Sequence, residues 1–253
     1  MTDPFESPKR KLVRAKQHIY DFESCFRTFR DGNPYVQIAE PDADVPDNVV
    51  HKLQLAKPLP SSLDLIAADI VNNLRTVLDQ AVYAVAIASG HDITHASFPF
   101  RETPVEFERA VAGKSNYLPQ EILALLRTFK SYKGGNDLLR ALNDWCNADK
   151  HALLSVAETA TVRIHTKVQS TGFMSIPTTP TWDRGKHQIV LFTTGPSTEK
   201  LEYDMSFSLF VFFDQIEAIR GKEAISVFYA MAAEVQGILL ALEAECERLG
   251  FVK

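Results

Sequence analysis

Two stretches of this sequence carry polar side chains at helical spacing, and their residue types suit binding or proton transfer. In the first, polar residues share one arc at 100° per residue: Asp69, Asn72, Asn73, Arg75, Thr76, Asp79, Gln80 and Tyr83. This polar stripe contains no Lys or Glu, which usually cover solvated helix faces. Asn, Asp and Thr are poor helix formers. The composition therefore favours a face that meets a specific partner over an ordinary solvated surface, which is the alternative.

The second stretch places its polar residues on one side: Arg140, Asn143, Asp144, Asn147, Lys150 and His151. Histidine is the usual proton carrier near neutral pH. Together with Arg75, His151 would form a catalytic pair if the two stripes faced each other. The expected binding residues are Asp69, Asn72, Asn73, Asp79, Gln80, Asn147, Asp149 and Lys150.

Asp149 falls on the apolar side of the second stretch. A buried carboxylate needs a partner, and an arginine with paired donors suits it best. Arg75 and Arg140 are the candidates, so the structural interpretation of Asp149 is a clamp between two helices.

The elements that position these stripes follow from periodicity and from Gly and Pro breaks. We expect helices at 7–30, 62–89, 106–112, 118–128, 136–151 and 222–249, and strands at 35–38, 49–55, 161–169, 188–193 and 203–213. This order predicts an α+β fold with a helical bundle core of about five helices and an antiparallel sheet of about five strands. We expect a single mixed domain over 1–253, with two domains divided near Leu154 as the alternative.

Composition narrows the functional classes. The 253 residues carry a net charge of -5, which argues against a protein dedicated to coating nucleic acid. Three widely spaced cysteines argue against a disulfide framework or a cysteine zinc site. The N-terminal residues contain no apolar signal core, and no apolar run approaches membrane-spanning length. We therefore expect a cytoplasmic protein that does not contact membranes.

Three blocks of the sequence resemble a family of uncharacterised bacterial proteins. They are Asp69–Gln80, Phe98–Phe100 and Asn147–His151. Members of that family typically read Asp, two residues, His-Asn-Leu-Arg, two residues, Leu-Asp-His, and later Asn-x-Asp-Lys-His. The family's first block also resembles the HEPN motif of helical ribonucleases and toxin components, which commonly dimerise.

The HEPN resemblance implies metal-independent cleavage of RNA, in which His moves protons and Arg stabilises phosphate charge. This chain departs from that pattern at two positions, because Asn72 and Gln80 stand where the family has histidine. An amide cannot carry a proton at pH 7, so the resemblance implies a degenerate site unless His151 substitutes.

Other constellations are weaker. His91 and His95 are spaced four apart but lie in an expected loop without a third ligand, and Arg75 would repel a cation held by Asp69 and Asp79. We expect no metal and no cofactor.

Three hypotheses follow. The first is an interaction protein with a degenerate HEPN-like site, which forms a homodimer through the polar stripes. The second is an active metal-independent ribonuclease of a defence or toxin system, and RNA is a candidate partner. The third is a protein that binds a nucleotide or another small anion between its helices.

Overall fold

The computed structural model describes residues 3–94, 96–147, 156–167, 173–177, 182–183, 185–196, 202–213 and 216–252. For 156–167, 202–209 and 212 it describes the backbone alone. The chain divides into two compact units. The helical unit comprises Met1–Ser24, Ser61–Ser155 and Phe213–Lys253, and the sheet unit comprises Cys25–Pro60 and Val156–Phe212.

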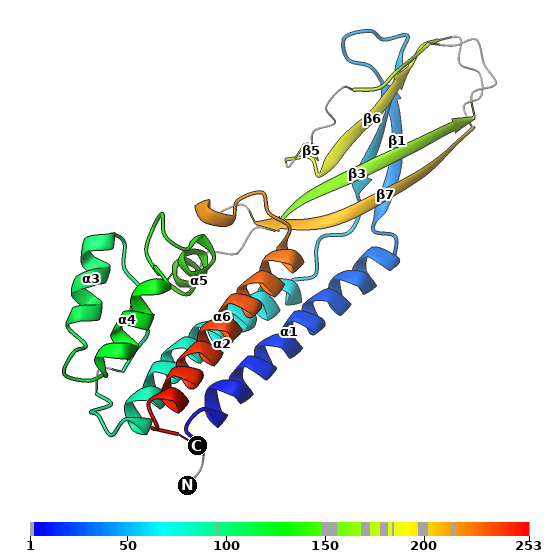
Figure 1. Ribbon diagram of the computed structural model, residues 1–253. Coiled ribbons are helices and arrows are strands. Elements are labelled where there is room, and N and C mark those ends of the chain that lie inside the picture. Colours follow the sequence, from blue (N-terminus) through cyan, green and yellow to red (C-terminus); the bar gives the residue numbers. More distant parts are fainter. Residues whose placement is uncertain are drawn as a thin grey trace. The chain divides into compact units, whose positions relative to one another are not determined.

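The helical elements are α1 (Glu6–Asp31), α2 (Ser62–Ala88), α3 (Pro104–Ala112), α4 (Gln120–Thr128), α5 (Asp137–Asn147), the 3-10 turn η1 (Glu217–Ile219) and α6 (Ala224–Arg248). The three long helices α1, α2 and α6 lie side by side, and the shorter α3, α4 and α5 lie to one side of them (Figure 1).

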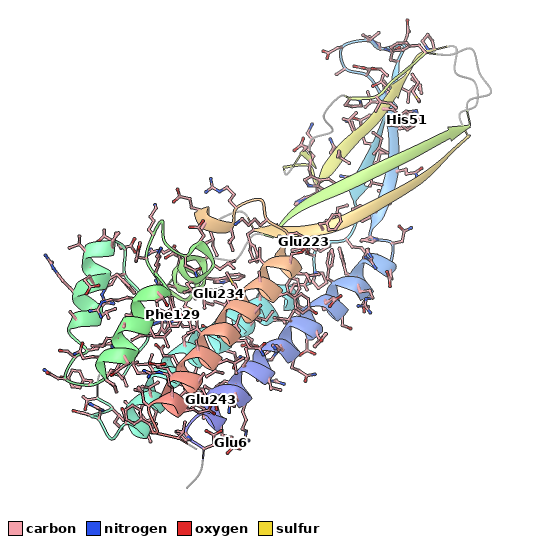
Figure 2. The ribbon with its side chains drawn as sticks, viewed as in Figure 1. Glu6, His51, Phe129, Glu223, Glu234 and Glu243 are labelled. Atoms are coloured by element: carbon pink, nitrogen blue, oxygen red, sulfur yellow. The ribbon has the colours of Figure 1, made fainter. Side chains whose placement is uncertain are left out.

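The core of the helical unit lies between α2 and α6. The apolar arc of α2 is fully buried, as its periodicity predicted: Ile70, Val71, Leu74, Val77, Leu78, Ala81 and Val85. α1 closes the other side through Phe22, whose ring packs edge-on against Phe228 of α6 with centroids 5.2 Å apart. Polar contacts follow the same helices, and Glu234 and Glu243 lie along α6 (Figure 2). Glu243 forms an ion pair with Lys9 of α1.

The boundaries of the helices follow local chemistry. Gly90 adopts a φ of 71° directly after α2, a conformation that glycine enters without steric penalty. α3 begins with a capping box, in which the Thr103 hydroxyl accepts from the Glu106 amide while the Glu106 carboxylate accepts from the Thr103 amide. The Asn136 side chain accepts from the Leu139 amide at 3.1 Å and so starts α5.

The sheet unit contains β1 (Tyr35–Pro41), β2 (Val49–Leu55), β3 (Val156–Lys167), β4 (Met174–Ser175), β5 (Trp182–Asp183), β6 (Gln188–Thr194) and β7 (Glu202–Phe213). Five of these strands form an antiparallel sheet in the order β1-β2-β6-β4, with β5 also paired to β6. β3 and β7 pair separately as a two-stranded sheet.

The aromatic face of that sheet centres on β2 and β6. The His51 imidazole stacks on the Phe192 ring with centroids 4.4 Å apart, and its Nε2 lies 3.2 Å from the Thr194 hydroxyl. Burial lowers the pKa of His51 below its usual range. His51 is therefore part of the packing of the sheet.

The predicted α+β class is confirmed, with six α-helices among the described residues and a five-stranded antiparallel sheet. The membership of the sheet differs from the expectation, because two of the five predicted strands, β3 and β7, pair with each other instead. The single domain stays a prediction, and one change of unit lies directly before Val156, close to the alternative boundary at Leu154.

Helix α6 is long and apolar enough to cross a membrane, judged by length and composition alone. The core helix of a soluble protein meets the same criterion. Ten of its residues are buried against the other helices, among them Phe228, Val235 and Leu242. The packing of the helical unit thus accounts for much of its apolar composition.

Candidate functional site

The eight residues of the polar stripe on α2 differ in how exposed they are. Asp69, Asn72 and Tyr83 are exposed, whereas the other five polar positions are half-buried: Asn73, Arg75, Thr76, Asp79 and Gln80. None of the eight is fully buried, so the predicted arc is correct. Two of the half-buried residues contact α1, two contact the segment Phe98–Phe100, and the Thr76 hydroxyl donates to the Asn72 carbonyl of its own helix.

Asn73 and Gln80 contact α1. The Lys11 ammonium donates to Asn73 Oδ1 at 3.2 Å, and the Ser7 hydroxyl donates to Gln80 Oε1 at 3.3 Å. The Asn73 amide nitrogen also donates to the Asp69 carbonyl at 2.7 Å. These two predicted binding residues therefore hold α1 against α2.

Arg75 and Asp79 anchor the segment that follows α2. The guanidinium carbon of Arg75 lies 4.0 Å from the centroid of the Phe100 ring, a cation–π contact. Its Nη2 lies 3.6 Å from Asp79 Oδ2, and Asp79 Oδ1 accepts from the Phe98 amide at 2.9 Å. The pair thus fixes both ends of the Phe98–Phe100 turn on the surface of α2.

One nitrogen of Arg75, Nη1, is buried and has no hydrogen-bond partner among the residues that the structure describes. A buried donor left without an acceptor is destabilising by roughly 1–3 kcal/mol. Among the described residues, the cluster around Arg75 therefore lacks an acceptor for Nη1.

Cys146 of α5 lies beside the same pair. Its thiol donates to the Val71 carbonyl at 3.7 Å. Burial raises the pKa of this thiol to about 11, while Arg75 opposes the shift and Asp79 adds to it. Because the thiolate is the nucleophilic form, Cys146 is inert at neutral pH.

The residues of the second predicted stripe differ in burial, and some of them lie outside the described residues. α5 packs against α2 and α6, and Asn143, which was predicted on the polar side of this helix, is buried with its apolar residues. The reason is that the buried side of α5 is wide enough to include a polar residue. It consists of Leu139, Ala141, Leu142, Asn143 and Trp145. Asn147 is exposed at the end of the helix. Asp149, Lys150 and His151 lie outside the described residues, so the pairing of Arg75 with His151 stays a prediction.

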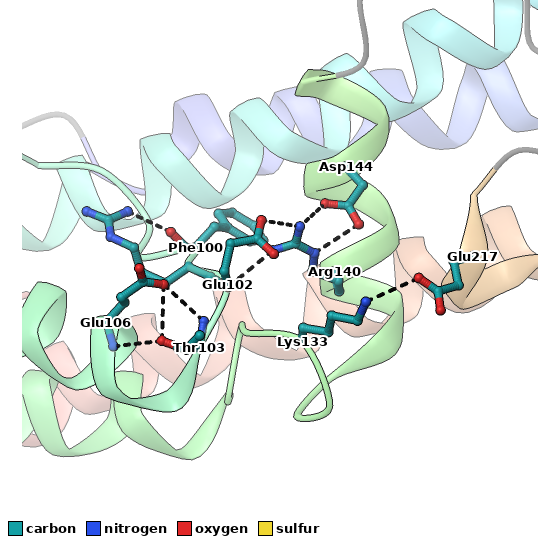
Figure 3. A network of polar contacts seen from close by, with 9 residues as sticks. Phe100, Glu102, Thr103, Glu106, Lys133, Arg140, Asp144 and Glu217 are labelled. Atoms are coloured by element: carbon teal, nitrogen blue, oxygen red, sulfur yellow. Dashed lines mark hydrogen bonds and ion pairs between the residues drawn. The ribbon is translucent and has the colours of Figure 1, made fainter.

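Arg140 is held by carboxylates of its own neighbourhood (Figure 3). Its Nε lies 2.9 Å from Asp144, one turn along α5, and its Nη2 pairs with Glu102 ahead of α3. A third nitrogen donates to the Arg101 carbonyl at 3.3 Å. Arg140 therefore ties α5 to the start of α3.

Two cationic residues near this region, the exposed Arg101 and the buried Lys114, were not among the site residues predicted from the sequence. Lys114, directly after α3, is only 9% exposed, and its ammonium lies 3.5 Å from the Ser97 hydroxyl. Burial lowers the pKa of Lys114, the positive charge of Arg101 lowers it further, and Asp79 opposes the shift. A lysine just past the end of a short helix carries no pattern that distinguishes it from a solvated one.

The described part of the chain contains no group of three or more His, Cys, Asp or Glu side chains placed to hold a metal ion. No protein-family model matches this chain, and neither the curated proteins nor the solved structures gave a similar protein. The resemblance to the uncharacterised bacterial family and to HEPN proteins rests on the sequence blocks.

Proposed function

We propose that this chain is a non-catalytic bacterial cytoplasmic protein that acts by self-association, with a degenerate HEPN-like site on α2. The observation that carries the non-catalytic part is the engagement of Arg75. Its guanidinium is covered by the Phe100 ring and paired with Asp79. The ring lies over the guanidinium, and the Asp79 carboxylate beside Nη2 would repel a phosphate.

The position that would supply the proton carrier supports the same conclusion. Gln80 is a carboxamide, and its oxygen accepts from Ser7 of α1. The thiol of Cys146, the other candidate next to Arg75, is protonated at neutral pH. Neither group can take a proton from a ribose hydroxyl.

The exposed line of α2 supports the self-association. This line runs through five exposed residues and the half-buried Thr76 and Gln80: Leu65, Asp69, Asn72, Thr76, Gln80, Tyr83 and Ile87. Leu65 and Ile87, near its two ends, are 70% and 48% exposed. Large apolar side chains at both ends of a line whose one charged member is Asp69 are typical of an interface more than of a solvated helix.

The residue types along this line are complementary under two-fold rotation about Thr76. Leu65 and Ile87 lie eleven positions from Thr76, Asp69 and Tyr83 lie seven, and Asn72 and Gln80 lie four. Two antiparallel copies of α2 would therefore pair an apolar residue with an apolar one, a carboxylate with a phenol, and an amide with an amide. Such self-complementarity is what a two-fold interface requires.

Sedimentation velocity tests the self-association. We expect a dimer at micromolar concentrations, and we expect Asn72→Lys to convert it to a monomer by placing two ammonium groups at the interface. Thr128→Lys, at an exposed position of α4, is the matched control and should leave the dimer intact. A wild-type monomer over the whole concentration range would refute the proposal.

Incubation with RNA in EDTA tests the absence of catalysis. We expect intact RNA with the wild-type protein and with Arg75→Ala. RNA cleavage by the wild type that Arg75→Ala abolishes would establish the ribonuclease alternative instead.

A further inference from the structure

A pocket of about 530 Å³ opens between the segment after α2, the end of α3 and the turn that follows α3. Its described lining includes Thr94, Ser97, Arg101, Gly113, Lys114 and Tyr117. The volume falls in the range of small-molecule sites, roughly 300–1,000 Å³, and exceeds that of a single inorganic anion. None of these residues belongs to the polar stripes.

The charge of this lining is positive. Arg101 and Lys114 contribute two cations, and none of the described lining residues is acidic. The two charges repel each other: burial is the main cause of the lowered pKa of Lys114, and the positive charge of Arg101 lowers it further. A bound dianion would relieve this repulsion, because it attracts both cations at once.

The backbone holds these cations in place. The Arg101 amide donates to the Ser131 carbonyl at 3.2 Å, and the Ser131 hydroxyl donates to the Pro99 carbonyl. On the opposite wall, the Lys114 amide donates to Val111 at 3.0 Å at the end of α3. The main chain at both residues is therefore fixed, and the Arg101 guanidinium is itself oriented by donating to the Phe100 carbonyl at 2.6 Å, which reduces the entropy lost when a ligand binds.

The hydroxyl groups differ in what they can offer a ligand. The Thr94 hydroxyl donates to the Asp92 carboxylate at 2.6 Å, so its proton is already engaged and Thr94 only lines the pocket. The Ser97 oxygen accepts from Lys114 at 3.5 Å, which directs its own O–H toward another acceptor. Ser97, Arg101 and Lys114 therefore supply donors of the kinds that bind tetrahedral phosphate oxygens.

We propose that this pocket binds the phosphate group of a small phosphate monoester through Arg101, Lys114 and Ser97. The phosphate dianion matches the two cations in charge, and the remaining volume, with the Tyr117 ring in its wall, accommodates the organic part. The three proposed ligand residues belong neither to the proposed dimer interface nor to the Arg75–Asp79–Phe100 cluster, although Asp79 lies close enough to influence the pKa of Lys114.

Thermal unfolding with added ligand tests this proposal at constant ionic strength. The probes are AMP, ribose 5-phosphate and inorganic phosphate, with sodium acetate as the monoanionic comparison. A ligand that binds the folded state raises the unfolding temperature with concentration. We expect AMP and ribose 5-phosphate to raise it more than acetate does. A response to inorganic phosphate as well would place the recognition on the phosphate group.

Titration calorimetry of the phosphate monoester then assigns the residues. Lys114→Met keeps the apolar stem and Arg101→Gln changes an exposed side chain, and each should weaken AMP binding about tenfold by removing a charge-assisted hydrogen bond. Lys133→Met removes an exposed lysine that pairs with Glu217 and is the control. Equal responses to AMP and acetate, or an affinity that neither Lys114→Met nor Arg101→Gln lowers, would overturn the proposal.

These measurements are made alongside sedimentation, so the two proposals fail separately. A monomer that binds AMP through Lys114 overturns the dimer and keeps the pocket. A dimer that binds no phosphate monoester overturns the pocket and keeps the dimer.

Discussion

The guanidinium of Arg75 lies over the ring of Phe100, with 4.0 Å between the guanidinium carbon and the ring centroid. This contact changes the interpretation of the polar stripe on α2. An arginine that read as a ligand for phosphate instead fastens the chain segment after α2 to the helix, and Asp79 completes the fastening through the Phe98 amide. Arg75 and Asp79 are of types that suit catalysis, but in this protein they pack the Phe98–Phe100 turn against α2.

Arg75→Ala should therefore destabilise the fold. The loss of the cation–π contact and of the ion pair is expected to lower the free energy of unfolding by about 1–2 kcal/mol. Urea unfolding followed by circular dichroism measures it. Arg10→Ala removes an arginine that is 80% exposed and paired with Glu6, and should have almost no effect. Equal stability of the two variants would contradict the anchoring role.

Substitutions at Asp79 separate its charge from its hydrogen bond. Asp79→Asn keeps an oxygen that can accept from the Phe98 amide, whereas Asp79→Ala leaves that amide without this acceptor. We expect the alanine variant to be less stable than the asparagine variant by about 1 kcal/mol or more. Chemical denaturation of both variants provides the comparison. Equal stability of the two variants would contradict a role for the hydrogen bond, because both variants lose the ion pair with Arg75 and differ only in the acceptor for the Phe98 amide.

The buried Nη1 of Arg75 bears on the predicted clamp by Asp149. Since Arg140 already has Glu102 and Asp144 as partners, Arg75 is the better candidate for this carboxylate. A double-mutant cycle tests the pair: Asp149→Asn should lower stability in the wild type and have little effect in the Arg75→Ala background. Additive losses would show that the two residues do not interact.

The thiol of Cys146 predicts a dependence of stability on alkaline pH. Its pKa is raised from 9.0 to about 11 in the folded protein, so folding favours the protonated form. The stabilisation is complete below pH 9 and is lost as the pH rises toward 11. Denaturation midpoints between pH 8 and pH 10.5 should fall less steeply in Cys146→Ser than in the wild type. Parallel slopes would exclude this contribution.

Helix and strand positions were largely predictable from the sequence. The apolar arc Ile70–Val85 has an unbroken helical period, and Gly90 and Pro34 mark sharp boundaries, so α2 and the end of α1 were placed within two residues. The pairing of the strands was not predictable, because alternation identifies a strand without specifying its neighbour. β3 and β7 accordingly form a pair apart from the larger sheet.

The candidate site was predictable in position but not in chemistry. Periodicity places Arg75 and Asp79 on one side of α2, yet it cannot foresee that Phe100, 25 residues later in the chain, covers the guanidinium. The pocket at Arg101 and Lys114 depends on the meeting of a loop with the end of a short helix. A tertiary contact of this kind produces no periodic pattern in the sequence.

The most direct test of the account is cross-linking by cysteines placed on the exposed line of α2. In the two-fold arrangement, Thr76 faces its own copy, whereas Leu65 faces Ile87. Mild oxidation should therefore join Thr76→Cys into a covalent dimer. Leu65→Cys and Ile87→Cys should stay unlinked alone and form a disulfide-linked dimer when mixed. The wild type, with its three native cysteines, is the control. Cross-linking of Leu65→Cys with itself, or none in the Thr76→Cys protein, would contradict the antiparallel α2 dimer.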